Sequence, residues 1–396
     1  MKEAKFVFIE TKIEGAESTK PSLTYWHDAW RRLKQNKSSM IGIIIIFLII
    51  CFGIIGPYLT PYSYSDQVNE YRNLPPILKL YKADDDLYLH VSKDYNIFKV
   101  SKDGRLLERL QLDKNKRDII NKIYVYKYGD EEIKLDFSYN LLPTKQGYDY
   151  DYTIEYKGQV LTEPWSSKLN KKFPFGTDEL GRDILTRVMY GARISLLVAF
   201  IATFVNLFIG VIYGSISGYE GGRVDDIMMR IVDIINSVPL VLYVILLMVW
   251  FRGRGLTNIV IALSSVYWVG MARLVRGQML SLKEQEFVLA ARTMGVSKMK
   301  IITRHLIPNA IGPIIVSMAM MIPSAVFTES FLSFIGLGVS APMASWGTLA
   351  NNSLPGLTTY PYQLFFPALS IALTMLAFNF VGDGLRDALD PRLRKG

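Results

Sequence analysis

Long apolar blocks separated by polar segments constrain the fold of this chain more than any other feature of its sequence. The first block, Met40–Leu59, contains no charged residue. A helix rises about 1.5 Å per residue and the hydrocarbon core of a bilayer is about 30 Å thick, so a helix over this block can cross a membrane. Five further blocks follow, approximately at Ile194–Ser217, Ile227–Phe251, Leu256–Leu274, Ala310–Leu337 and Leu364–Val381. The pattern predicts six transmembrane helices.

The first block could also be a signal sequence. The polar segment before it, residues 1–39, is too long for that, and no small-x-small cleavage site follows the block. We therefore expect a retained transmembrane helix at residues 40–60.

Residues 61–172 are rich in Lys, Asp, Glu and Tyr and contain short alternating runs typical of strands. One run, Ile123–Tyr126, is joined to another, Ile133–Phe137, through Gly129-Asp130, which is a hairpin pattern with a turn signal. The segment predicts a small β-rich domain inserted between the first and second helices.

The distribution of Lys and Arg predicts the orientation. If the N-terminus is cytoplasmic, the basic segments Arg273–Pro308 and the tail from Arg386 are cytoplasmic too, whereas the opposite loop Val339–Gln363 has no Lys or Arg. This is the positive-inside pattern. Arg252 and Arg254, in a short outside loop, are an exception. We therefore attribute the net charge of +9 to the cytoplasmic loops of a membrane protein and not to a nucleic-acid-binding surface. Both termini are expected to be cytoplasmic and the insertion extracytoplasmic.

The loop within residues 277–308 has the pattern of two short helices broken by a glycine. Four residues of the first helix share a face: Phe287, Ala290, Ala291 and Met294. Gly295 suits a left-handed position after that helix, and Ser297 suits the N-cap of the second. Three residues form the stripe of the second helix: Met299, Ile302 and Leu306. Pro308 then begins the next membrane helix. Such a hairpin needs either the membrane surface or a groove on another protein to cover its apolar face.

The segment from Glu286 to Pro308 resembles the characteristic loop of importer-type ABC transporter permeases, of pattern E-A-A-x3-G-x9-I-x-L-P. Ala290, Ala291, Gly295 and Pro308 match it at the correct spacing, whereas Leu289, His305 and Ile307 depart from it. The resemblance implies that this loop docks into a cleft on an ATPase subunit and transmits ATP-driven closure to the pore. The residues implied are Glu286, Phe287, Ala290, Ala291, Gly295, Ser297 and Pro308.

Three further stretches, beginning at Phe175, Glu329 and Gly382, resemble the C-type permease of the dipeptide/oligopeptide/nickel group. That resemblance covers the first helix and nearly everything from Phe173 onward, but not the insertion. It implies an all-α membrane protein with a permease core at 173–385 and a cytoplasmic tail at 386–396. It also implies a second homologous permease, two cytoplasmic ATPases that bind ATP and Mg²⁺, and an extracellular peptide-binding lipoprotein. The substrate is expected to be a dipeptide or oligopeptide.

Glu329 lies within the fifth apolar block, where a carboxylate is costly unless it faces a wet cavity or a partner. It could line the transport pathway and meet the peptide, or it could bond to a neighbouring helix. Asn206 is a second pathway candidate, although such residues more often form hydrogen bonds between helices.

The sequence has no G-x4-G-K-[ST] phosphate loop and no metal-ligand or nucleophile motif, so this chain is expected to be non-catalytic and to hold no cofactor. Three alternatives remain: a permease for nickel or another small solute, a membrane receptor with an outer ligand domain, and a secondary transporter. The insertion could contact the substrate-binding protein or act as a passive spacer.

Overall fold

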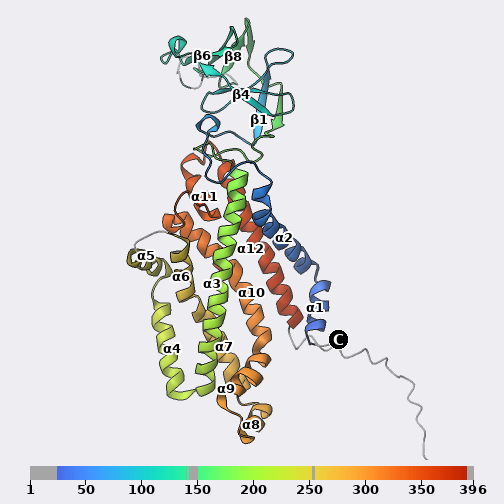
Figure 1. The fold of residues 1–396 in the computed structure, drawn as a ribbon, viewed down its shortest axis with the longest axis vertical. Coiled ribbons are helices and arrows are strands. Elements are labelled where there is room, and N and C mark those ends of the chain that lie inside the picture. The colour runs from blue at the N-terminus through green and yellow to red at the C-terminus, as the bar shows by residue number, and fades with distance from the viewer. Residues whose placement is uncertain (1–24, 140, 142–149, 252–254, 390–396) are drawn as a thin grey trace, which may run out of the picture.

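The computed structural model describes residues 25–139, 141, 150–251 and 255–389. Residues 1–24, Arg252, Arg254 and the part of the predicted tail from residue 390 onward therefore lie outside the described residues. A β-rich domain sits at one end of a long helical bundle, and the short helices of the 277–308 loop lie at the other end (Figure 1).

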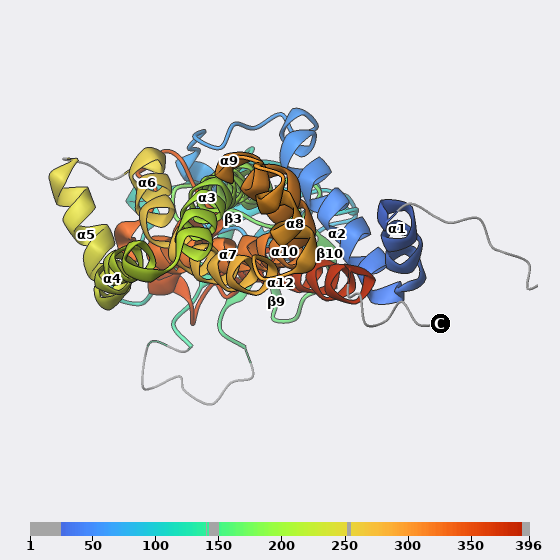
Figure 2. The ribbon, with the colours of Figure 1, turned by 90° about the horizontal axis from the view of Figure 1, so that it is seen from below.

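The helices of the bundle are α1 (Tyr25–Gln35), α2 (Lys37–Ile54), α3 (Ile184–Glu220), α4 (Gly222–Ser237), α5 (Leu240–Trp250), α6 (Leu256–Val266), α7 (Trp268–Leu282), α8 (Glu286–Thr293), α9 (Lys298–Ile301), α10 (Ile307–Leu332), α11 (Trp346–Asn352) and α12 (Tyr362–Leu389). Viewed from the end opposite the strands, α1 and α5 lie on opposite sides of the bundle (Figure 2).

Five helical segments of the described chain are long and apolar enough to cross a membrane: Lys37–Tyr58, Ile184–Glu220, Leu256–Leu282, Lys298–Leu337 and Tyr362–Leu389. The block expected at Ile227–Phe251 forms α4 and α5 instead, and these are bent by 86°. Val238 is extended (φ −84°, ψ 123°) just before Pro239, because a proline disfavours helical conformation in the residue that precedes it. The six-helix prediction holds as five continuous spans and one bent pair.

The β domain contains two antiparallel five-stranded sheets, with orders β10-β1-β2-β3-β4 and β5-β6-β7-β8-β9. The strands are β1 (Ile77–Lys82), β2 (Tyr88–Val91), β3 (Ile97–Val100), β4 (Leu106–Arg109), β5 (Gln111–Leu112), β6 (Ile123–Tyr128), β7 (Glu131–Asp136), β8 (Thr153–Tyr156), β9 (Gln159–Leu161) and β10 (Ser166–Leu169). The predicted hairpin is confirmed as β6–β7, which pairs Tyr128 with Glu131 across the turn. Gly129 in that turn has a φ of +60°, which glycine adopts without steric cost.

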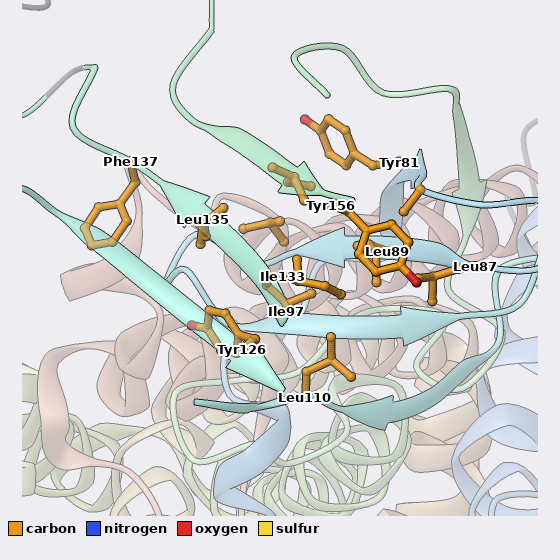
Figure 3. Packing of buried hydrophobic residues seen from close by; sticks show 13 residues of the cluster. Tyr81, Leu87, Leu89, Ile97, Leu110, Tyr126, Ile133, Leu135, Phe137 and Tyr156 are labelled. Carbon is orange, nitrogen blue, oxygen red and sulfur yellow. The ribbon is translucent and has the colours of Figure 1, made fainter. Parts of the chain in front are cut away.

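The core of the β domain lies between strands of both sheets (Figure 3). Leu89 and Ile97 from one sheet and Ile133 and Leu135 from the other are fully buried and belong to one cluster. Tyr126 also belongs to this cluster, and its hydroxyl donates a hydrogen bond to the Tyr95 carbonyl at 2.6 Å. The domain thus forms an apolar core from its own residues.

Hydrogen bonds fix the β domain to the bundle. Tyr360, just before α12, donates to Asp94 Oδ1 at 2.8 Å, and Lys93 Nζ donates to the Thr359 carbonyl at 2.7 Å. A further hydrogen bond joins Leu74, just before β1, to Thr177, just before α3: the Leu74 amide donates to Thr177 Oγ1 at 2.9 Å. The turn after β2 therefore rests on the connection between α11 and α12.

Within the bundle, α3 packs closely against α7 along a row of glycines spaced four residues apart, Gly210, Gly214 and Gly218. A Cβ atom at Gly214 would overlap the Ala272 carbonyl oxygen. Small residues at this spacing let two membrane helices approach at backbone distance. This contact fixes α7, and with it the start of the 277–308 loop, relative to α3.

Candidate functional site

The 277–308 loop forms two short helices, α8 and α9, at the end of the bundle farthest from the strands (Figure 1). Gly295 has a φ of +74°, and the Val296 amide bonds back to the Ala291 carbonyl at 3.1 Å. Gly295 therefore has the left-handed conformation expected after α8. Ser297 occupies the N-cap position of α9, but its side chain makes no capping hydrogen bond, so the expected side-chain cap is absent.

The apolar residues of this loop divide into a buried set and an exposed set. Val288 and Ala291 of α8 are 0% and 1% exposed and pack against the bundle. Phe287 and Met294 are 40% and 76% exposed, and Ala290 is exposed on the same side. The sequence placed Ala291 with these three residues, whereas the structure turns it inward. The described residues leave uncovered an apolar face formed by Phe287, Ala290 and Met294.

The apolar residues of the second helix and the turn that follows it also form an exposed set and a buried set. Met299 is 64% exposed, whereas Ile302 and Leu306 are buried. The chain does not break at Pro308, because α9 continues through a π-helical turn at Ile302–Leu306 into α10. Pro308 lies in the first turn of α10, where its missing N–H costs little. The loop is therefore joined, as one continuous helical segment, to the part of α10 that carries Glu329.

Charged groups at the base of the loop join it to α3 and α4. Arg276 of α7 makes two hydrogen bonds to the Asp225 carboxylate, each 2.6 Å long. Lys298 Nζ lies 2.8 Å from a carboxylate oxygen of Glu220. Bidentate Arg–carboxylate pairs hold one geometry better than single contacts do. A displacement of the loop would therefore move the ends of three helices together.

Glu329 lies in α10 and is fully buried (0% exposed). Its carboxylate accepts hydrogen bonds from Ser195 of α3 at 2.8 Å and from Ser333 at 2.7 Å. Ser195 Oγ also accepts the Trp346 amide of α11 at 3.3 Å. The carboxylate thus belongs to a cluster of Ser195, Glu329, Ser333 and Trp346, which we call the Glu329 cluster. This geometry corresponds to the helix-bonding interpretation of Glu329.

Sequence reasoning missed the partners of Glu329. Ser333 was detectable, because it lies one helical turn after Glu329. Ser195 and Trp346 were not, since they come from distant helices. Asn206 is 1% exposed, and neither polar atom of its amide has a hydrogen-bond partner among the described residues. The roles of Glu329 and Asn206 in a pathway stay predictions.

The described residues contain no group of three or more His, Cys, Asp or Glu side chains that could hold a metal ion. The loop presents an exposed apolar face on a helical hairpin, and either the membrane surface or a groove on another protein is needed to cover it.

Comparisons with known proteins identify relatives of this chain. Residues 210–395 match the family described as the binding-protein-dependent transport system inner membrane component. Residues 24–76 match the N-terminal TM domain of oligopeptide transport permease C. The dipeptide transport system permease protein DppC of Bacillus subtilis (strain 168) is 41% identical over 98% of this chain and 93% of its own length. This chain belongs to the C-type permeases of the dipeptide and oligopeptide ABC importers.

Two further relatives support that assignment. The oligopeptide transport system permease protein OppC of Bacillus subtilis (strain 168) is 41% identical over 96% of this chain and 94% of its own length. OppC of Escherichia coli (strain K12) is 49% identical over 56% of this chain and 72% of its own length. A solved MetNI methionine ABC transporter covers 52% of this chain and 96% of its own, at 19% identity and a TM-score of 0.44; the family assignment does not depend on it.

Membership in this family makes the chain a membrane-embedded transport permease. The family operates with ATPase and substrate-binding partners, and the several apolar helices described above agree with a place in the cell membrane.

Proposed function

We propose that this permease forms half of a pore that imports dipeptides or oligopeptides across the cell membrane. The observation that carries the proposal is the identity over nearly the whole chain, insertion included, with relatives named as dipeptide and oligopeptide permeases. The other half is a second, homologous permease. A peptide-binding lipoprotein delivers the substrate on the side of the β domain, and both termini lie in the cytoplasm.

ATP hydrolysis takes place on two partner ATPases, which hold ATP and Mg²⁺, while this chain is non-catalytic and binds no cofactor. The coupling surface is the exposed face of the 277–308 loop, formed by Phe287, Ala290 and Met294 and flanked by Glu286. On the other side of α8, Val288 and Ala291 pack against the bundle and hold that face in position. ATP-driven movement of an ATPase cleft around the loop is transmitted to α10 without a flexible joint, because α9 and α10 are continuous.

The second permease covers apolar surface that the described residues leave open on α4 and α5. Ile234 of α4 is 66% exposed, and Val249 and Trp250 of α5 are 73% and 82% exposed. We assign these side chains to another subunit rather than to lipid because α5, which packs on α6 through Val244 and Met248, lies at the outer edge of the bundle (Figure 2).

The Glu329 cluster holds α11 beside the outer part of the pathway. In this arrangement Glu329 acts on the peptide indirectly, by fixing the position of α11. If Glu329 also contacts the substrate, Glu329→Gln lowers uptake without lowering assembly with the partner subunits. Full uptake by that variant would rule out the direct contact.

The hydrogen bonds of Asp94 with Tyr360 and of Lys93 with Thr359 hold the β domain, residues 61–172, over the connection that leads into α12. We propose that it receives the substrate-binding lipoprotein. Deletion of Gln67–Asn170 should reduce recovery of that lipoprotein, whereas unchanged recovery would make the domain a spacer.

The test of the function is ATP-dependent uptake by the purified transporter in vesicles. The complex is isolated through this chain from gently solubilised membranes, its subunits are identified by mass spectrometry, and uptake of a labelled tripeptide and of Ni²⁺ is compared. Recovery of a second permease, two ATPases and a peptide-binding lipoprotein, with uptake of the tripeptide alone, is the expected result. Uptake of Ni²⁺ alone would assign the chain to the small-solute branch.

A further inference from the structure

An apolar groove of about 480 Å³ lies between α2 and α12 in the half of the bundle nearer the β domain. We call it the α2–α12 groove. One wall is a stripe on α2 and the other a stripe on α12, and two side chains form its base. The lining residues are Ile45, Leu48, Ile49 and Phe52 on α2, Phe366, Leu369, Ser370 and Leu373 on α12, and Phe175 and Trp346 at the base.

Packing at one end and aromatic side chains at the other create this space. Near the middle of the bundle the two helices touch, because Gly42 of α2 has no side chain and a Cβ there would lie 2.6 Å from the Ala377 carbonyl oxygen. Ser39 also donates to the Phe380 carbonyl at 3.0 Å. Toward the β domain, the rings of Phe175 at the base and Phe366 on α12 stack, with their centroids 3.9 Å apart.

The polar atoms along the groove are already bonded within the protein. Ser370 Oγ donates to the Phe366 carbonyl at 2.9 Å, and Trp346 Nε1 donates to the Val188 carbonyl at 3.0 Å. The lining contains no charged side chain. Water or a polar ligand would therefore lose hydrogen bonds on entering, whereas a hydrocarbon chain would not.

The mouth opens on the outer surface of two membrane-spanning segments. Leu48, Leu369 and Leu373 at the mouth are 58%, 41% and 38% exposed. A surface of this kind in a bilayer is in contact with lipid tails. We propose that the α2–α12 groove binds one acyl chain of a membrane phospholipid, in the leaflet on the side of the β domain.

The bound chain reaches the Glu329 cluster through Trp346. The indole of Trp346 lines the groove, while its backbone amide donates to Ser195, which in turn bonds to Glu329. The acyl chain therefore supports α11 from the lipid side, and it exchanges more slowly than chains on the open surface because three sides of it are enclosed.

Photolabelling tests this assignment. The full transporter is reconstituted in phosphatidylethanolamine–phosphatidylglycerol vesicles containing phosphatidylglycerol with a diazirine-bearing acyl chain. It is then diluted into an excess of unlabelled lipid, irradiated and analysed by peptide mass spectrometry. Leu48 and Phe47 are a matched pair, since they are adjacent and 58% and 63% exposed, but only Leu48 lines the groove.

We expect labelling of Leu48 that survives dilution and exceeds that of Phe47 several-fold. Leu369→Trp, which fills the groove, should abolish the excess, whereas Leu376→Trp, at a residue of α12 that is 44% exposed and does not line the groove, should not. Equal labelling of Leu48 and Phe47, or loss of both on dilution at the same rate, would mean ordinary surface lipid and overturn the proposal. Disulfide capture of a partner subunit by Leu48→Cys would also overturn it, by giving the groove a protein occupant.

Discussion

The β domain and the helical bundle bury apolar residues in different ways. The β domain closes a core from residues of both sheets, as in a water-soluble protein (Figure 3), and a second cluster around Leu80 and Phe98 lies beside it. The bundle leaves large side chains such as Phe208 and Trp250 65% and 82% exposed. The β domain is therefore built for water and the bundle for the lipid bilayer. In the bundle, a set of large exposed apolar side chains indicates contact with lipid or with another subunit. The exposed face of Phe287 and Met294 on α8 is one such apolar surface, and the proposed function assigns it to a partner ATPase.

The largest effect should come from the β-domain core. Ile133 is 0% exposed, and Ile133→Ala should lower the free energy of unfolding of this domain by about 2–5 kcal/mol, because it removes buried methyl groups and leaves a cavity. Hydrogen exchange of β6 and β7 in the full chain measures the loss. Ile120→Ala is the control: Ile120 is 84% exposed, and its change should stay within about 0.5 kcal/mol. Similar losses in both variants would show that the core is not closed as described.

Acid should weaken the β domain selectively. Burial lowers the pKa of His90 to about 4, although its ring nitrogen Nδ1 bonds to the Lys79 carbonyl. The pKa in the unfolded chain is about 6.5. Between these values the unfolded state binds a proton that the folded state does not, so stability is complete above pH 6.5 and falls as the pH drops toward 4, by about 3 kcal/mol.

Unfolding of the β domain measured across this pH range tests the sign. His90→Phe removes the titrating group and should flatten the dependence of the β domain, whereas the bundle, whose histidines His27 and His305 are not buried, should show the same slope in both proteins. A steep loss that persists in His90→Phe would assign the pH sensitivity to other groups.

Adding a methyl group at the close contact between α3 and α7 should have a smaller effect on stability, because overpacking typically costs about 1–3 kcal/mol. Gly214→Ala should lower the thermal stability of the bundle, since its Cβ overlaps the Ala272 carbonyl. Gly270→Ala adds the same methyl group in α7, where the new Cβ meets no atom of another helix within 4 Å, and should not lower the thermal stability. Equal behaviour of the two variants would argue against the close α3–α7 contact.

The smallest effect is expected on the water-exposed face of the sheet. Lys134 and Glu155 pair across β7 and β8, with Nζ and Oε2 3.0 Å apart and both side chains nearly half exposed. Lys134→Ala should cost less than about 1 kcal/mol, and salt should reduce the difference further. A greater loss than that of Ile133→Ala would reverse the ranking on which the comparison rests.

Local patterns in the sequence predicted local structure well. The apolar blocks, the β6–β7 hairpin and the left-handed Gly295 each depend on residues close together in the chain. The bend at Pro239 also had a local signal, which the hydropathy of its block concealed. Non-local features could not be predicted: the pairing of β10 with β1, the bonds of Glu329 to Ser195, and the inward turn of Ala291, which depends on the surface packed beneath α8.

The most direct test of the account is whether the exposed face of α8 binds the ATPase. Phe287→Asp and Leu289→Asp place the same charge on two residues of α8 that are 40% and 44% exposed, but on opposite sides of the helix, since two positions subtend about 200°. The account predicts that Phe287→Asp loses copurification of the ATPase and ATP-driven peptide uptake, whereas Leu289→Asp retains both and both variants reach the membrane in equal amounts. Retention of the ATPase and of uptake by Phe287→Asp would contradict the coupling role assigned to this loop.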